Sequence, residues 1–204
     1  MNIHKCLRFT SATLLLATVS VSYASGPWYA GAAGGSSSTG ASIEEMHPNL
    51  VADHGAINSV LSKSTSSTGW KAFVGYQYNP KFAVEGSYTS FGTYSSEVDT
   101  AGDGLITTKL NPTAWCLSGI GTHSLQNKFG LTGRVGICKW DDGFSSSVAE
   151  PIAYSDGFAP VVGLGASFGI NPNLTVRAEY ERYFGVIHGD KEADLISLGV
   201  AFGF

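Results

Sequence analysis

The sequence has little charge, few cysteines and no long apolar run beyond its first residues. Only 14% of its 204 residues are Asp, Glu, Lys or Arg, against roughly 25% in soluble domains. The net charge is −4, so the chain lacks the basic surface that binds nucleic acid, and no such partner is predicted. Beyond residue 24 no apolar run approaches the roughly 20 residues of a membrane-spanning helix. The composition therefore excludes a helical membrane protein.

The first 24 residues have the pattern of an export signal. A short basic start is followed by an apolar stretch, and the small residues Ser22 and Ala24 suit a cleavage site. We expect residues 1–24 to be a signal peptide that is cleaved, so that residues 25–204 form the mature domain. Export places that domain in an oxidising compartment.

Glycine is abundant instead, with 26 residues, and polar and apolar residues alternate with a period of two, which predicts strands. We expect eight strands, at 27–35, 69–79, 81–93, 109–124, 128–140, 158–170, 174–186 and 193–204. Three short turns join them at one end, at 79–81, 125–128 and 171–173. Four longer loops lie at the other end, at 36–68, 94–108, 141–157 and 187–192. An even strand number with short turns on one side is typical of a transmembrane β-barrel.

The face that carries the polar residues distinguishes a membrane barrel from a soluble sandwich. In the seventh segment Arg177, Glu179 and Glu181 share one face, and apolar residues share the other. Three inward charges would destabilise a sandwich core, whereas a membrane barrel shows its apolar face to lipid. The sixth and eighth segments place glycine and serine opposite an apolar stripe, which leaves room in the lumen for long side chains. The sequence predicts an all-β, eight-stranded, antiparallel up-and-down transmembrane β-barrel.

Motifs spread over the mature chain carry a resemblance to a known family. They are Gly26–Gly31, Val74–Tyr88, Gly133–Gly136, Arg177–Tyr180 and the ending Leu195–Phe204. With these motifs the chain resembles the OmpA-like transmembrane barrels, and more broadly the small outer-membrane β-barrel family of Gram-negative bacteria. The resemblance implies an outer-membrane location, with lipid, lipopolysaccharide and the outer-membrane assembly machinery as partners. The terminal strand with Phe202 and Phe204 looks like the signal that such proteins present to that machinery.

The resemblance also implies a buried network of charges inside the barrel. By matching motif positions it is assigned to Glu85, Arg134, Arg177 and Glu179. The alternation adds Glu181, which leaves three carboxylates against two guanidinium groups. Lys71, a water molecule or a bound proton could balance the excess, because an unpaired buried charge is costly. Where the family pattern has a lysine in the fourth strand, residues 117–121 contain no cation.

Two cysteines, Cys116 and Cys138, remain in the expected mature chain. They lie equally far from Asn127, so a turn centred there places them directly opposite each other on neighbouring strands. Opposed residues in antiparallel strands are close enough for a disulfide, which we expect. Two buried thiols in a register shifted by one residue remain the alternative.

The other polar residues give weaker signals. Thr122-His123-Ser124 contains a base and a nucleophile, but neighbouring strand residues face opposite ways, so no catalytic site is predicted. His47 and His54 lack the spacing of metal ligands, and neither a metal nor a cofactor is expected. Five aromatic residues could form an interfacial girdle, namely Trp28, Tyr78, Phe82, Trp115 and Phe204.

Three functions remain open for such a barrel. The sequence favours a non-enzymatic protein with a mainly structural role and exposed surface loops. A narrow ion pore gated by the charge network is the first alternative. The second is an adhesin in which the loop 36–68 contacts a host or surface ligand.

Overall fold

A computed structural model describes the two ends of the expected mature domain and most of what lies between them. The described residues are 26–39, 60–63, 66–100, 104–125, 128–141, 143, 145–146, 156–187 and 191–204. The predicted signal peptide and part of each long loop lie outside these ranges. Within them, no helix is long and apolar enough to cross a membrane.

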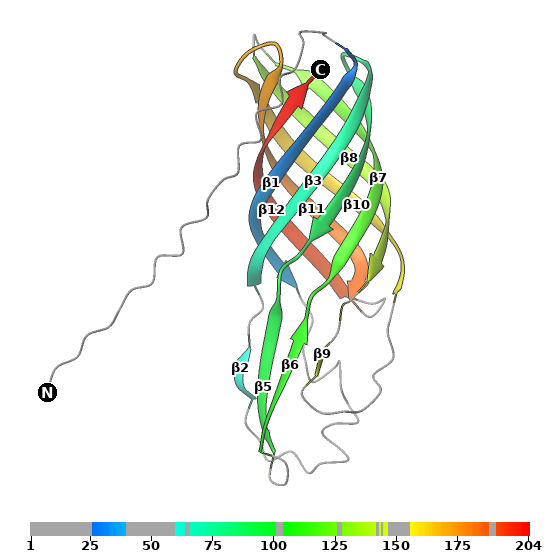
Figure 1. Cartoon of the computed structure of the whole chain (residues 1–204). Helices are drawn as coiled ribbons and strands as arrows, with labels where there is room; N and C mark the ends of the chain where they lie inside the picture. The colour runs from blue at the N-terminus through cyan, green and yellow to red at the C-terminus, as the bar shows by residue number, and fades with distance from the viewer. Residues whose placement is uncertain are drawn as a thin grey trace, which may run out of the picture.

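Eight strands close into an antiparallel barrel (Figure 1). They are β1 (Trp28–Thr39), β3 (Ser66–Asn79), β4 (Phe82–Ser90), β7 (Thr113–Ser124), β8 (Phe129–Asp141), β10 (Asp156–Gly169), β11 (Leu174–Ile187) and β12 (Lys191–Gly203). Each barrel strand pairs with the next one along the chain, and β1 closes the barrel against β12. The eight-stranded up-and-down barrel predicted from the alternation is therefore confirmed.

A second sheet lies beyond one end of the barrel, where the sequence predicted only loops (Figure 1). Its order is β2-β5-β6-β9, from β2 (Val60–Lys63), β5 (Tyr94–Thr100), β6 (Gly104–Leu110) and β9 (Ser145–Ser146). The expectation of a loop over 94–108 was wrong, because β5 and β6 continue as a paired hairpin. Gly92, with a φ of 80°, and Pro112, which lacks an N–H, separate this hairpin from β4 and β7.

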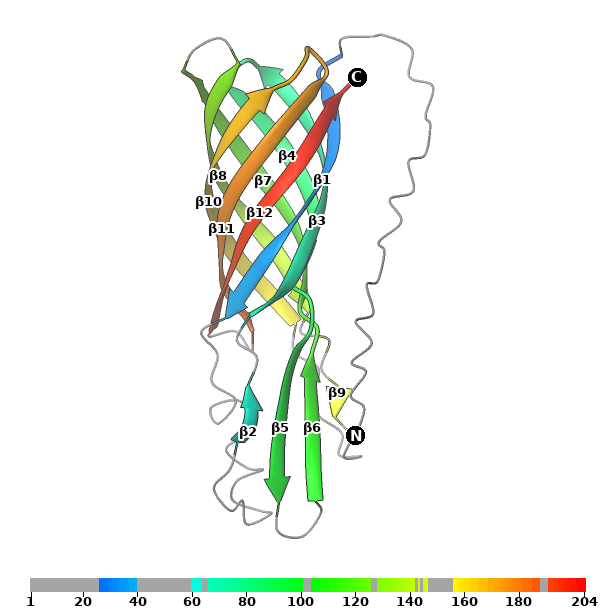
Figure 2. The ribbon, with the colours of Figure 1, turned by 90° about the vertical axis from the view of Figure 1, so that its left-hand side faces the viewer.

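The short turns lie at the opposite end, together with the start of β1 and the end of β12 (Figure 2). Two of these turns are fixed by an asparagine side chain. Asn79 Oδ1 accepts hydrogen bonds from the backbone N–H groups of Lys81 and Phe82. Asn171 Oδ1 does the same for residues 173 and 174. Such local bonds explain why these two connections could be recognised from sequence.

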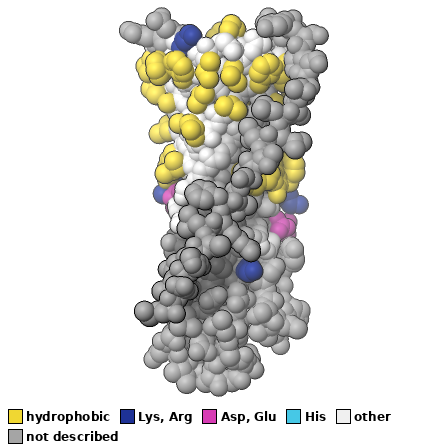
Figure 3. All heavy atoms as spheres, turned by 60° about the vertical axis from the view of Figure 1, so that its left-hand side comes forward, with side chains coloured by type: hydrophobic (Ala, Val, Ile, Leu, Met, Phe, Trp, Pro, Cys, Tyr) yellow, Lys and Arg dark blue, Asp and Glu magenta, His cyan; other side chains and the backbone are white. Residues whose placement is uncertain are grey.

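The outer wall is apolar. Large hydrophobic side chains of every barrel strand are exposed, and aromatic pairs lie near both ends. Phe129 and Phe168 pack with ring centroids 4.8 Å apart near the short turns, and Tyr88 and Trp115 do so, also at 4.8 Å, near the other end. Figure 3 shows apolar side chains gathered on the wall, bordered above and below by charged ones. An apolar band between aromatic girdles is the surface of a barrel that spans a membrane.

The lumen changes character along the barrel axis. Its half nearer the second sheet is filled by a buried apolar cluster, which we call the plug. The plug consists of Phe91, Tyr94, Leu110, Ala114, Cys116, Cys138, Trp140, Ala159, Val161, Tyr183, Val186, Ala193 and Leu195. The sequence predicted charged and small residues in the lumen, and it did not predict this apolar layer beside them.

Candidate functional site

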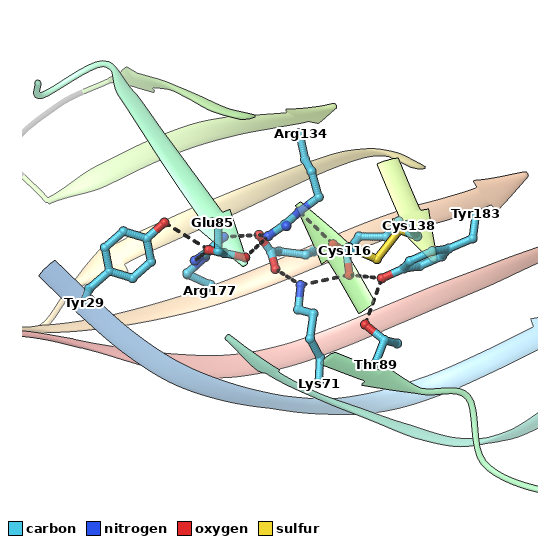
Figure 4. A network of polar contacts seen from close by, with 11 residues as sticks. Tyr29, Lys71, Glu85, Thr89, Cys116, Arg134, Cys138, Arg177 and Tyr183 are labelled. Carbon is cyan, nitrogen blue, oxygen red and sulfur yellow. Dashed lines mark hydrogen bonds and ion pairs between the residues drawn. A yellow bond between two sulfur atoms is a disulfide. The ribbon is translucent and has the colours of Figure 1, made fainter. Parts of the chain in front are cut away.

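Six charged side chains meet in the lumen next to the plug, from β3, β4, β8 and β11 (Figure 4). They are Lys71, Glu85, Arg134, Arg177, Glu179 and Glu181, and none is more than 8% exposed. Five of them are the residues that the sequence assigned to a lumen network. The alternation of each strand turns these positions inward, so four separate segments contribute to one cluster.

Glu85 joins the two guanidinium groups. Its Oε1 lies 2.5 Å from Arg134 Nη2, and its Oε2 lies 2.8 Å from Arg177 Nη1. Tyr29 donates a hydrogen bond to the same Oε2 over 3.0 Å. Three donors therefore surround one carboxylate that is completely buried.

Lys71 is the cation that balances the cluster. Its Nζ lies 2.7 Å from Glu179 Oε2 and 2.8 Å from Glu181 Oε2. Three cations thus face three carboxylates. Of the explanations that the sequence left open for the excess negative charge, the structure therefore supports Lys71. Lys71 comes from β3. A lysine was expected in residues 117–121 from the family resemblance, and Lys71 supplies the positive charge that is missing there.

The remaining contacts close the network. Arg134 Nε lies 2.7 Å from Glu181 Oε1, and Arg177 Nη2 lies 2.5 Å from Glu179 Oε1. Every carboxylate of the cluster therefore contacts at least two cations. Paired, largely desolvated charges of this kind are expensive to separate, because each would be left buried without a partner.

Glycines on the neighbouring strands make room for these side chains. Gly163 pairs with Glu181 in the register of β10 and β11, and Gly165 pairs with Glu179. A Cβ at Gly163 would lie 3.1 Å from the Glu181 side chain, and one at Gly165 would lie 3.0 Å from that of Glu179. The glycine-rich face of the sixth predicted strand therefore has a packing role.

The plug contacts the network through Tyr183. Its hydroxyl donates to Glu181 Oε2 over 3.2 Å and lies 3.2 Å from Thr89 Oγ1. Cys116 and Cys138 are partners in the β7–β8 register, and the structure joins them by a disulfide inside the plug. Sequence reasoning missed Tyr183, although its inward position follows from the same alternation as Glu179 and Glu181.

A cavity of about 220 Å³, which we call the vestibule, lies on the short-turn side of the network. It is lined by Tyr29, Gln77, Ala83, Ile120, Thr122, Thr132, Ser167, Pro172, Asn173, Thr175, Arg177, Ala201 and Gly203. The space among Arg134, Glu179 and Glu181 leaves no volume for a water molecule. The vestibule, the network and the plug therefore follow one another along the axis.

The structure separates the other residues that the sequence singled out. Phe202 and Phe204 lie at the end of the chain, and their side chains are 40% and 41% exposed. Within Thr122-His123-Ser124, Thr122 lines the vestibule and His123 is exposed. His47 and His54 lie outside the described residues. Among the residues that are described, no three His, Cys, Asp or Glu side chains gather as a metal site.

Comparisons with known proteins agree with this architecture. A family model of the OmpA-like transmembrane domain matches residues 24–204. Among curated proteins the sequence has no significant match.

Several solved structures share the fold. Neisserial surface protein A is 14% identical with a TM-score of 0.58, over 87% of this chain and 97% of that one. The attachment invasion locus protein Ail of Yersinia pestis is 14% identical with a TM-score of 0.53, over 88% and 99%. The N-terminal barrel of Pseudomonas aeruginosa OprF is 10% identical with a TM-score of 0.52, over 88% and 98%. At such low identity these likenesses show the fold alone.

Proposed function

The chain belongs to the OmpA-like transmembrane domain family of outer-membrane barrels, and from that premise we propose a mainly structural protein with a sealed lumen. Its surface loops are then the parts that contact the surroundings. The apolar wall contacts outer-membrane lipid and lipopolysaccharide. The terminal residues Phe202 and Phe204 are presented to the assembly machinery, after export by a signal peptide over residues 1–24. No catalytic role is included in the proposal.

The filled lumen is the observation that carries this proposal. A conducting path needs water along its whole length, whereas the space around Arg134 and Glu181 has no room for water. Beyond it, plug residues such as Trp140 and Leu195 are no more than 3% exposed. Opening a path would require both separation of paired charges and displacement of an apolar layer.

Conductance in a planar bilayer tests the proposal against the pore alternative. We expect no openings from the protein or from an Arg134→Ala variant, because the plug is unchanged in both. Folding is checked by the different gel mobility of heated and unheated samples, and a wide porin serves as the positive control. Reproducible openings whose size changes with Arg134→Ala would support a gated pore and contradict a structural role.

Loop-mediated adhesion is the second candidate, and the second sheet favours it. The paired backbone of β5 and β6 carries the chain beyond the barrel, away from the short turns (Figure 1). In this family of folds the long loops lie on the extracellular side. A structure of Ail in complex with the heparin analogue sucrose octasulfate is 16% identical, with a TM-score of 0.51, over 87% of this chain and 99% of that one.

Two loop deletions test this candidate. Residues 96–108 are replaced by Asn-Gly in one variant, and residues 40–59 by a Gly-Ser linker in the other. Adhesion predicts that cells bearing the intact protein are retained on heparin-coated beads. It also predicts that at least one deletion abolishes retention while the heat-dependent gel shift persists. Retention no greater than that of cells without the protein would count against heparin-type adhesion.

A further inference from the structure

Two pairs of opposite charge lie at the long-loop end of the outer wall. Lys139 Nζ lies 3.8 Å from Asp156 Oδ2, and Arg182 Nε lies 2.8 Å from Asp194 Oδ1. Outside the buried network, every Asp or Glu that the structure describes belongs to this end. Among the described residues, the short-turn end therefore has no carboxylate side chain.

The short-turn end is basic instead. Lys81 and Lys128 are both exposed there, in the turns that lead into β4 and β8. Lys128 Nζ donates to the carbonyl of Ile170 over 3.0 Å, which leaves further donors because an ammonium group has three. The final residue, Phe204, lies beyond β12, which borders neither β4 nor β8. Both ammonium groups therefore lie at the membrane boundary without a carboxylate partner among the described residues.

A patch of the wall without side chains lies beside this basic end. It consists of Gly119 and Gly121 on β7 and Gly133 on β8, and Gly121 pairs with Gly133. A Cβ at Gly121 or Gly133 would meet nothing within 4 Å, so the outer surface is open there. Exposed apolar side chains surround the patch, namely Phe82, Val84, Leu117, Leu131, Val135 and Leu164. The glycines therefore form a shallow apolar depression in the wall.

The basic end and the depression lie on the same strands. Lys81 directly precedes Phe82, which pairs with Gly121, and Lys128 directly precedes β8, which carries Gly133. An anionic phospholipid matches both features, because it has a charged headgroup and apolar chains. We propose that β4, β7 and β8 hold one such lipid of the leaflet on the short-turn side. Its phosphate contacts the two lysines, and an acyl chain lies over the three glycines.

A second copy of the chain fits this surface less well. Two copies in one membrane have the same orientation, so a contact through β7 and β8 would bring their basic ends together, and like charges repel. An anionic headgroup is attracted by the same lysines. The proposal rests on the contact with lipid that belongs to the proposed function, and it adds a defined position and a lipid class.

Native mass spectrometry can count the lipids that stay bound to the protein. The purified protein is supplied in micelles with equal amounts of phosphatidylglycerol, which is anionic, and phosphatidylcholine with the same acyl chains. We expect one phosphatidylglycerol to be retained in preference to phosphatidylcholine. Lys81→Gln and Lys128→Gln should each reduce this preference about fivefold. Gly121→Leu should reduce lipid retention, because the added side chain fills the depression.

Matched substitutions elsewhere on the wall are the controls. Lys139→Gln removes a cation at the long-loop end, and Gly34→Leu adds the same bulk on β1, where a Cβ would meet only the Gly69 carbonyl oxygen, at 4.0 Å. Both should retain phosphatidylglycerol as the parent protein does, and heat-dependent gel mobility checks that every variant folds.

Three results would overturn the proposal: no preference for phosphatidylglycerol, an equal loss in the control variants, or a protein dimer in place of the bound lipid. None of them bears on the sealed lumen, which the conductance experiment tests separately.

Discussion

At the scale of single residues, Lys71 determines whether the lumen is electrically balanced. It is completely buried, and its Nζ lies within 2.8 Å of both Glu179 and Glu181. Without it, three buried carboxylates would share two guanidinium groups. Breaking one partner out of a buried ion pair typically costs about 3–5 kcal/mol.

We therefore expect Lys71→Met to lower the free energy of unfolding by about 3–5 kcal/mol. The measurement is urea unfolding in lipid vesicles, followed by tryptophan fluorescence. Lys128→Met is the matched control, because Lys128 is exposed near a short turn, where its Nζ donates to the carbonyl of Ile170. Equal stability of the two variants would show that the network contributes little to folding.

Gly163 tests the packing around the same charges. A Cβ at this position would lie 2.9 Å from the carbonyl oxygen of Tyr180 and 3.1 Å from Glu181 Cγ. Overpacking of this kind costs about 1–3 kcal/mol, so Gly163→Val should unfold at a lower urea concentration. Gly133→Val is the control, since a Cβ there meets nothing within 4 Å. A Gly163→Val protein as stable as Gly133→Val would mean that the lumen has spare room at this height.

At the scale of strands, the alternation allowed most of the barrel to be predicted. It gave the strand number and the inward faces, and the position of the β7–β8 turn gave the pairing of Cys116 with Cys138. It failed over 94–108, where local pairing of β5 with β6 extends past the wall. Alternation reports the face of one strand, but it does not report which inward residues of distant strands meet. The contacts of Lys71 with Glu179 and Glu181, and of Tyr183 with Glu181, therefore emerge only when the barrel closes.

The β7–β8 hairpin provides a prediction at this scale. The disulfide joins cysteines 22 residues apart, and closing such a loop reduces the entropy of the unfolded chain by an amount worth about 3 kcal/mol. The double variant Cys116→Ala, Cys138→Ala should lose stability of that order in urea. The intact mass of the native protein should be two hydrogen atoms below that of the reduced chain. Two titratable thiols in freshly unfolded protein would contradict the bridge.

At the scale of the whole molecule, the lumen consists of three layers: vestibule, network and plug. The sequence could not predict this order, because the height of a side chain in a barrel depends on strand tilt and on the stagger between neighbours. Each layer combines residues from several strands. The result is an asymmetric lumen that has a cavity on the short-turn side and is filled on the side of the long loops.

This asymmetry predicts one-sided access to the lumen, which two alanine-to-cysteine variants can measure. Ala83 lines the vestibule and is partly exposed, whereas Ala193 is completely buried in the plug. With a membrane-impermeant maleimide, we expect Ala83→Cys to react only after the outer membrane is permeabilised, because the short turns face the periplasm. Ala193→Cys should stay unlabelled under both conditions, and the parent protein reports any reaction of native cysteines. Labelling of Ala193→Cys in intact cells would mean that the plug opens to the outside, and the sealed barrel would have to be abandoned in favour of a pore.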